Sequence, residues 1–254
     1  MKNENQHFSA DRRKFGRHFW IGAAVAVIFT AASAVYRKNR FDLKIGEEKV
    51  GSKEYQLCMD LVKYDVKMEI QKRYDALYGE DFWEQSYEGQ YGYEILADHT
   101  VEKIKYIHAV YDLAEEYGDV SDGSFAAIEK RWKQENAKRQ KKVEDGEVIY
   151  GLKEYTFDLY MQYEISMYKE IYCNDTDRKG MDLTEEEVAE YYSQGEWVFQ
   201  DDGEKADLET ARIAVERELR EKKYDAMIAQ MTEDLEVSGD LEAVDRFTLD
   251  HLKR

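Results

Sequence analysis

Apolar residues recur every three to five positions along several long stretches of the sequence, with polar residues between them. Such spacing places apolar side chains on one face of an α-helix. Thr184 and Glu187 form a capping box at the start of one such stretch, and the chain has no proline to break a helix. The pattern predicts a mainly α fold, a helical bundle of about six helices. They cover residues 52–79, 93–117, 152–172, 184–192 and 204–236, with a further helix that opens at 121–122.

Both ends of this region indicate strands. Residues 42–51 read DLKIGEEKVG, with apolar positions on either side of a turn-like GEE. The tail, 237–254, has apolar positions at 241, 244, 247 and 249, and we expect a strand there that pairs back with residues 42–50. The bundle would then be closed by a small strand element formed by the ends of the domain. Residues 79–92, rich in Gly and aromatic residues, indicate a loop.

An uncharged apolar run covers residues 19–36, with basic residues on both sides. It is long enough for a membrane anchor, which takes about 17–25 residues; residues 1–18 would then be a cytoplasmic basic tail. Alternatively, it is a secretory signal peptide that is cut after Ala32-Ser33-Ala34. Residues 41–254 are expected outside the cytoplasm in both cases, either on a single-pass protein of the cell membrane or secreted after cleavage.

The charge is unevenly distributed. The whole chain carries −18, but the first forty residues carry eight Lys and Arg against two acidic residues, or +6, so residues 41–254 carry −24. Such an acidic domain repels nucleic acid, which excludes nucleic-acid binding as an expected function. Carboxylates are so frequent, at 55 Asp and Glu, that no pair of them indicates acid–base catalysis.

Few residues indicate a metal, a cofactor or a disulfide. The five histidines form no HExxH motif, and no glycine-rich phosphate-binding motif occurs, so no cofactor is expected. Asp175, Asp177 and Glu186 fall at ligand positions of a calcium loop, but Lys179 stands where an oxygen ligand is needed. The alternative is a polar loop before the next helix. Cys58 and Cys173 could form a disulfide or remain two buried thiols.

The predicted helix over 152–172 holds more aromatic residues than one buried face requires. It is either the central element of the bundle or the border of a groove for another polypeptide, since tyrosine combines an apolar ring with a hydroxyl that bonds backbone groups. Methionine adds contacts that adapt to different partners. Seven residues are candidates for peptide binding: Trp132, Tyr155, Phe157, Tyr160, Tyr163, Met167 and Tyr168.

Short motifs follow one another in a particular order. IGEEKVGSKEY leads into the first long helix, LYGEDFW follows it, and YGLKEYTFDLYMQYEIS and LTEEEVAEYYSQ come before a long closing helix. Over residues 41–240 this order resembles the helical domain of the SurA/PrsA group of exported chaperones and foldases. In that group a parvulin isomerase domain follows the EEEVAEYY helix. Here only a short stretch without His or Cys separates Tyr192 from Glu209, so the isomerase domain is missing.

The resemblance implies a chaperone domain that is not an enzyme. We expect a membrane-tethered holdase that binds unfolded or newly exported polypeptides. One alternative is an assembly module for a single dedicated partner in a secretion or envelope complex, and another is a residual peptidyl-prolyl isomerase. The expected partners are client polypeptides and the membrane through residues 19–36, and a homodimer is left open.

Overall fold

The computed structural model of the chain describes residues 41–199 and 203–253, and most of them are helical. Within these residues the mainly α class is confirmed, with seven α-helices, one more than the sequence predicts. In chain order the elements are β1 (Leu43–Ile45), β2 (Glu48–Val50), α2 (Ser52–Tyr74), a 3-10 turn (Phe82–Glu84), β3 (Ser86–Tyr87), β4 (Gln90–Tyr91), α3 (Gly92–Glu116), α4 (Phe125–Glu144), α5 (Phe157–Asn174), α6 (Glu185–Gln194), α7 (Leu208–Asp234), β5 (Val237–Gly239) and α8 (Leu241–Leu252).

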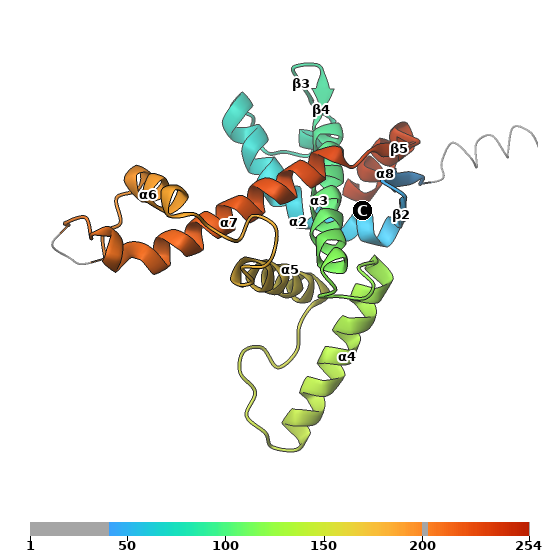
Figure 1. Cartoon of the computed structure of the whole chain (residues 1–254). Coiled ribbons are helices and arrows are strands. Elements are labelled where there is room, and N and C mark those ends of the chain that lie inside the picture. The colour runs from blue at the N-terminus through green and yellow to red at the C-terminus, as the bar shows by residue number, and fades with distance from the viewer. Residues whose placement is uncertain (1–40, 200–202, 254) are drawn as a thin grey trace, which may run out of the picture.

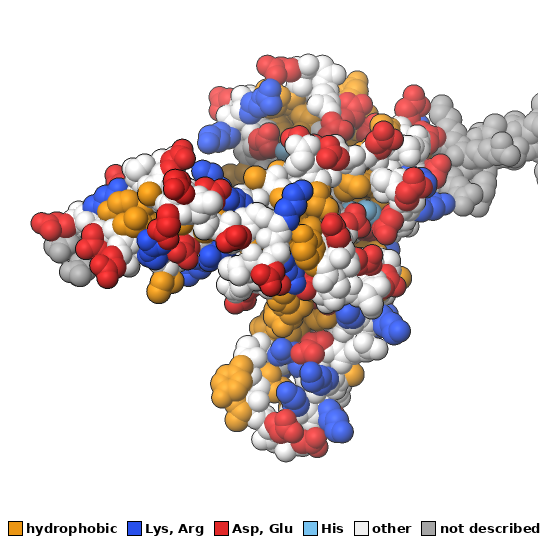
Figure 2. Space-filling model, viewed as in Figure 1, with side chains coloured by type: hydrophobic (Ala, Val, Ile, Leu, Met, Phe, Trp, Pro, Cys, Tyr) orange, Lys and Arg blue, Asp and Glu red, His pale blue; other side chains and the backbone are white. Residues whose placement is uncertain are grey.

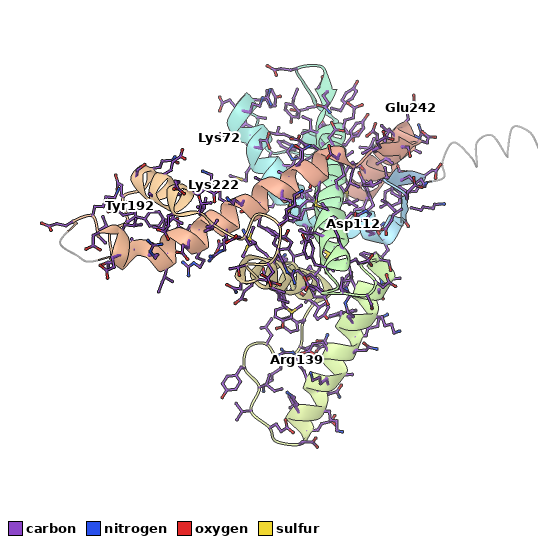
Figure 3. The ribbon with its side chains drawn as sticks, in the orientation of Figure 1. Lys72, Asp112, Arg139, Tyr192, Lys222 and Glu242 are labelled. Atoms are coloured by element: carbon purple, nitrogen blue, oxygen red, sulfur yellow. The ribbon has the colours of Figure 1, made fainter. Side chains whose placement is uncertain are left out.

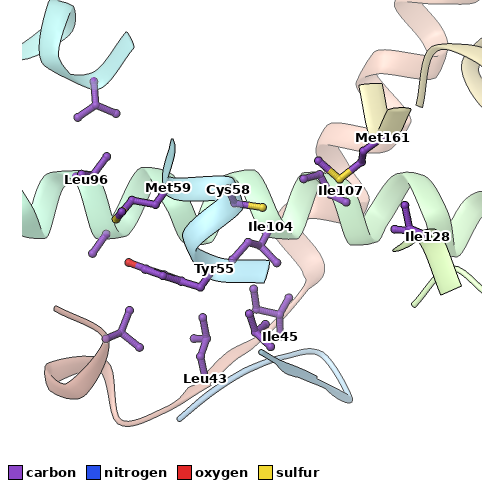
Figure 4. Packing of buried hydrophobic residues seen from close by; sticks show 14 of the residues in the cluster. Leu43, Ile45, Tyr55, Cys58, Met59, Leu96, Ile104, Ile107, Ile128 and Met161 are labelled. Atoms are coloured by element: carbon purple, nitrogen blue, oxygen red, sulfur yellow. The ribbon is translucent and has the colours of Figure 1, made fainter. Parts of the chain in front are cut away.

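Helix α3 is the centre of the bundle, because its apolar side chains are buried on several sides. Helices α2, α5, α7 and α8 all pack against it. Tyr55 and Met59 of α2 meet Ile104 of α3 in the main hydrophobic core, which Figure 4 shows. One of the two alternatives from the sequence made the helix now seen as α5 the central element. That helix leaves Leu159 and Tyr163 exposed, so its buried face is too narrow for the central position.

The two ends of the described region meet in a small antiparallel sheet with strand order β2-β1-β5. Leu43 in the middle strand lies opposite Val50 on one side and Gly239 on the other. Gly239 has a φ of 124°, and a Cβ at this position would overlap the carbonyl oxygen of Asp42. Only glycine tolerates both conditions. The prediction that the ends of the domain pair is confirmed.

Beyond β5 the tail is a helix, which corrects the predicted strand. The Asp240 side chain accepts a hydrogen bond from the backbone N–H of Ala243 at 3.0 Å and so caps α8. Val244 and Thr248 are buried one turn apart, and the Thr248 hydroxyl lies 2.6 Å from the hydroxyl of Tyr55. Apolar positions 241, 244 and 247 are three apart, which is the spacing of a helix and not the alternation of a strand.

The segment 79–92, expected to be a loop, contains the 3-10 turn and the β3–β4 hairpin. Phe82 and Trp83 are buried, and the hydroxyl of Tyr87 donates to the carbonyl of Phe82 at 2.9 Å. Strands of two residues are too short to show an alternating pattern in the sequence, so the hairpin escaped prediction.

Two arms leave the bundle in different directions (Figure 1). In one arm, α6 packs on the first half of α7 through Val188, Ala211 and Val215. In the other, α4 projects and the connection 145–156 returns along it to α5. On α4 only Ile128 is buried. Helix α5 packs on α3, α4 and α7, and so lies where both arms begin.

Among the residues that the structure describes, no helix is both long enough and apolar enough to cross a membrane. The predicted anchor or signal segment at 19–36 and the basic tail at 1–18 lie outside the described residues. Both therefore remain predictions from the sequence.

Candidate polypeptide-binding surface

The aromatic residues singled out from the sequence meet where α4, the connection 145–156 and α5 come together. The Tyr155 ring stacks on Tyr163 with 5.7 Å between ring centres and lies 6.0 Å from Tyr160. The rings of Trp132 and Phe157 are 5.4 Å apart. The structure thus places residues from two predicted helices in one cluster. These aromatic residues differ in burial, however, so some belong to the core and others are accessible to a partner.

Tyr160 and Tyr168 belong to the core, where they are 6% and 4% exposed. The hydroxyl of Tyr160 donates to Glu164 at 2.7 Å, and the ring of Tyr168 packs edge-on against Tyr111. Burial, followed by the nearby negative charge of Glu164, raises the pKa of Tyr168 to about 12. Neither ring is accessible to a client, so the predicted peptide-binding set has to be corrected at these two positions.

Glu164 fastens the root of α4 to α3 and α5. Its buried carboxylate accepts hydrogen bonds from Arg131 Nε at 2.8 Å, Arg131 Nη2 at 2.9 Å and the Tyr111 hydroxyl at 2.9 Å. Burial and the charge of Glu164 raise the pKa of Tyr111 far above its ordinary value, so its hydroxyl stays a donor. Because Arg131 belongs to α4 and Tyr111 to α3, this network fixes the direction of the α4 arm.

Trp132, Phe157 and Met167 are half-buried. Phe157 packs against Phe125, with 5.1 Å between the ring centres, and against Trp132 on its other side. Met167 packs against the main core. Of the seven candidates, Tyr163 is the most accessible, at 45% exposed, and it stacks on the half-buried Tyr155.

The connection 145–156 is fastened to α4 by side chains one helical turn apart. Trp132 Nε1 donates to the carbonyl of Tyr155 at 2.7 Å. The Asn136 amide donates to the same carbonyl at 2.8 Å and accepts from the Tyr155 N–H at 2.9 Å. Arg139, labelled in Figure 3, donates to the carbonyl of Leu152 at 2.6 Å. The backbone of the connection therefore follows a fixed path although it is neither helix nor strand.

Apolar side chains at the end of this arm are exposed, and we call them the apolar arm surface: Val143, Val148, Tyr150 and Leu152. Tyr150 is 87% exposed and Val148 is 74% exposed. Figure 2 shows hydrophobic side chains at one outer edge of the lower arm, and Lys and Arg side chains over the rest of the arm in this view. Exposed apolar residues that gather in this way mark interaction surfaces.

Sequence reasoning missed most of this surface. It placed Leu152 inside a helix, whereas α5 begins only at Phe157. Gly146 and Gly151 have φ values of 71° and 81°, which keep the segment between them out of a helix. These two glycines were the signal in the sequence that could have separated the segment from the helix.

A hollow of about 470 Å³ lies beside the apolar arm surface. Trp132, Val143 and Lys153 are among its lining residues. On α5, Leu159 and Tyr163 are also partly exposed, at 41% and 45%. Aromatic, aliphatic and lysine side chains thus line the hollow itself, an arrangement that suits a polypeptide partner better than a small molecule.

The segment that partly matches a calcium loop is organised by an arginine. Arg178 donates to Asp175 at 3.1 Å and to the two carboxylate oxygens of Asp119 at 2.6 and 2.8 Å. The hydrogen bond from Arg178 and a second from the Asp177 N–H lower the pKa of Asp175. Glu186 lies apart, in the first turn of α6. Within the described residues, no group of three or more His, Cys, Asp and Glu side chains is placed to hold a metal ion.

Cys58 and Cys173 do not form the disulfide that the sequence left open, because both are free thiols. Cys58 lies in the main core, and Cys173 lies in a second buried cluster with Tyr224. Burial raises the pKa of Cys58 to about 12 and that of Cys173 to about 11. Both behave as small apolar side chains, which is the other alternative given by the sequence.

Comparison with known proteins relates the chain to a chaperone. The relative is a protein of Bifidobacterium longum subsp. longum that is named chaperone for lacto-N-biosidase. The two sequences are 28% identical over 209 residues, which cover 82% of this chain and 74% of the relative. No protein-family model and no solved structure matches the chain. The similarity supports a chaperone relationship but does not indicate the SurA/PrsA group.

Proposed function

We propose that this protein is a membrane-tethered chaperone that acts outside the cytoplasm on one dedicated client polypeptide and catalyses no reaction. The apolar arm surface carries the proposal, since a client that covers it gains roughly 25 cal/mol for each Å² of apolar area removed from water. The relative is named for a single client, lacto-N-biosidase, which favours a dedicated client over a broad range of clients. An enzyme of that kind is accordingly the first client to test.

The geometry suits a client segment with an accessible backbone. Tyr163 and the apolar arm surface offer rings and aliphatic groups, and the nearby hollow of about 470 Å³ accommodates an apolar side chain of the client. The tyrosine hydroxyls can bond backbone groups that an unfinished fold leaves unpaired. Such contacts stabilise an incompletely folded client without any covalent step.

Tethering and export rest on the apolar run at 19–36, with its basic flanks. The order of motifs shared with the SurA/PrsA group supports an origin from an exported foldase that lacks its isomerase domain. A net charge of −24 on residues 41–254 keeps a complex with an aggregation-prone client in solution.

Co-expression tests the proposal. A lacto-N-biosidase is produced as an exported protein, with and without the full chain, and its soluble amount and specific activity are measured. We expect the full chain to raise both. Tyr150→Ala/Leu152→Ala should lose most of this gain, because it removes the most exposed ring of the apolar arm surface and an aliphatic neighbour. No gain with the unaltered chain would refute the proposed function.

The matched control is Tyr64→Ala/Leu77→Ala, which removes the same two residue types where they are 63% and 87% exposed, in the middle of α2 and beyond its end. For a dedicated client, this variant should retain the full gain. Both variants should keep the helical circular dichroism spectrum of the unaltered chain, since neither touches a buried side chain.

A broad holdase is the second candidate, because exposed apolar residues are not confined to the α4 arm, as Tyr64 and Leu77 show. A panel of unrelated heat-unfolded proteins distinguishes the two. A dedicated chaperone leaves their aggregation unchanged. A broad holdase suppresses aggregation across the panel, and the Tyr64→Ala/Leu77→Ala variant then loses activity as well.

A further inference from the structure

The α4 arm differs in charge from the rest of the protein. Residues 125–156 carry eight Lys and Arg against six Asp and Glu, a net +2, whereas the remainder of 41–254 carries −26. Within the arm, α4 itself carries seven basic and three acidic residues, a net +4. Seven of the 37 Lys and Arg residues of the chain thus lie on this one projecting helix of 20 residues.

One face of α4 carries exposed lysines, and we call it the basic face: Lys130, Lys133 and Lys141. These positions lie on one side of the helix, about a third of a turn away from the row that fastens the connection 145–156. Among the described residues, no ion pair joins Lys130 or Lys141 to an acidic side chain. Lys133 bonds Glu129 at 2.5 Å, but Glu129 also pairs with Lys53 at 2.9 Å. The positive charge of this face is therefore largely uncompensated.

The basic face also has a hollow. An open space of about 440 Å³ lies over α4 and is lined only by residues of this helix: Ala126, Glu129, Lys130, Lys133, Gln134 and Ala137. Its surface is mainly apolar. An aliphatic side chain of a partner fits such a surface, while carboxylates on either side of that side chain pair with the lysines.

The distance from the bundle lets the tip of this face, at Lys141, act independently of the acidic body. Helix rise places Lys141 roughly 20 Å beyond Ile128, the buried residue of α4. Charges in solution at physiological salt are screened over about 8 Å. The Arg131–Glu164 pair at the root holds the arm away from the body. An acidic segment can therefore approach the tip without strong repulsion from the remaining −26.

We propose that the basic face of α4 docks an acidic segment of the client polypeptide, in which apolar residues stand between carboxylates. The proposal rests on the proposed function and adds the chemistry of the client segment. Lys130, Lys133 and Lys141 would pair with its carboxylates, and the hollow over Ala126 and Ala137 would take one of its apolar side chains.

Fluorescence anisotropy with the full chain in a mild detergent tests this docking. Three labelled synthetic peptides are compared: one with Glu and Leu residues, one with Lys in place of every Glu, and one with Ser in place of every Leu. We expect the Glu/Leu peptide to bind at least about tenfold more tightly than either of the others, and the difference to shrink at high salt. Equal binding of the Lys/Leu peptide would overturn the proposal.

The test variant is Lys130→Glu/Lys133→Glu/Lys141→Glu, which should weaken binding of the Glu/Leu peptide roughly tenfold or more. Lys49→Glu/Lys72→Glu/Lys179→Glu makes the same change in net charge at exposed lysines elsewhere and should alter binding by less than about twofold. A milder variant, Lys130→Gln/Lys133→Gln/Lys141→Gln, should give a smaller loss and avoids new repulsion along α4. Unchanged binding by both arm variants would overturn the proposal.

Further outcomes distinguish a failure of the docking proposal from a failure of the proposed function. If the unaltered chain raises the yield of client and the Lys→Glu arm variant does so equally well, the docking proposal fails and the proposed function stands. If the unaltered chain binds vesicles of phosphatidylglycerol through the same lysines but not the Glu/Leu peptide, the basic face serves lipid and the docking proposal is again overturned. Absence of any gain in client yield refutes the proposed function itself, whatever the peptides do.

Discussion

The bundle around α3 and the α4 arm use similar residues for opposite purposes. In the bundle, Tyr55 and Ile104 are completely buried. On the arm, Tyr150 is 87% exposed, and Ile128 is the buried residue of a helix of 20 residues. The comparison shows that a high content of aromatic residues does not by itself distinguish a core from a binding surface. The bundle supplies stability, and the arm supplies exposed apolar and basic side chains.

The largest expected effect separates the bundle from exposed surface. Ile104→Ala should lower the free energy of unfolding by about 2–5 kcal/mol, because it leaves a cavity at a completely buried position. Ile213→Ala makes the same chemical change on α7 where the side chain is 85% exposed, and should cost less than about 0.5 kcal/mol. Urea unfolding measures both. Similar losses for the two variants would contradict this assignment of the core.

The second expected effect concerns the junction between bundle and arm. Glu164→Gln removes the charge that pairs with Arg131, and we expect a loss of about 2–4 kcal/mol, since Arg131 is itself partly exposed. The backbone amides of α4 should then exchange hydrogen faster. Glu154→Gln, an exposed carboxylate on the connection, serves as the control. If α4 exchanges as slowly in Glu164→Gln as in the unaltered chain, another contact orients the arm.

The third expected effect is a pH dependence that belongs to the bundle alone. Burial lowers the pKa of His108, but its hydrogen bond to Glu54 at 2.8 Å and the charges of Glu54, Glu48 and Asp112 outweigh burial and raise it. A raised pKa means that the stabilisation is complete below about pH 6.5, the ordinary value of histidine, and is lost as the pH rises through the folded-state value. The free energy of unfolding should therefore fall above about pH 6.5.

Substitution of this histidine checks the assignment. In His108→Gln the decrease of stability above about pH 6.5 should become shallower, while the control His99→Gln, on the same helix and paired less closely with Glu69 at 3.6 Å, should keep it. Thermal unfolding over a series of pH values measures the slope. An unchanged slope in His108→Gln would contradict this assignment, because the raised pKa of Asp245, about 6, places the effect of that carboxyl at lower pH.

The smallest expected effect on stability belongs to the arm. Tyr150→Ala/Leu152→Ala should change the free energy of unfolding by less than about 0.5 kcal/mol, because both side chains are exposed, yet it should abolish most of the gain in client yield. This is the reverse of what we expect for Ile104→Ala at a temperature where that variant remains folded. A large loss of stability in the arm variant would mean that the connection contributes to the core.

Several local features could be predicted because neighbouring residues decide them. The Thr184 hydroxyl accepts from the Glu187 N–H at 3.2 Å, and Glu187 accepts from the Thr184 N–H at 2.9 Å, as the capping box predicts. Helix α3 begins and ends within one residue of its predicted limits, since its apolar spacing is regular and Gly118 follows it. The strand β1 pairs with the tail as predicted, although the tail then turns into α8.

The candidate site could be predicted only in part. Apolar spacing showed that the chain from 150 to 172 has more rings than one face can bury, but not which rings would be buried. Tyr160 faces Glu164 and Arg131, while Tyr163, three residues later, faces outward. That choice depends on the rotation of α5 against α3 and α4, which is set by packing between segments far apart in the sequence.

The sequence by itself determined the helical class, the capping of individual helices, the closure of the domain by its own ends and the separation of a basic N-terminal region from an acidic remainder. These depend on the spacing of residues within a segment and on charges that can be counted. Only the tertiary structure decided that α3 is central and that Arg178 organises the loop that partly matches a calcium site. It also decided that Val148, Tyr150 and Leu152 are exposed on an arm fastened by Arg139 and Asn136. Burial depends on which segments pack into the same core. That packing joins segments far apart in the sequence, so the spacing of residues within one segment does not predict it.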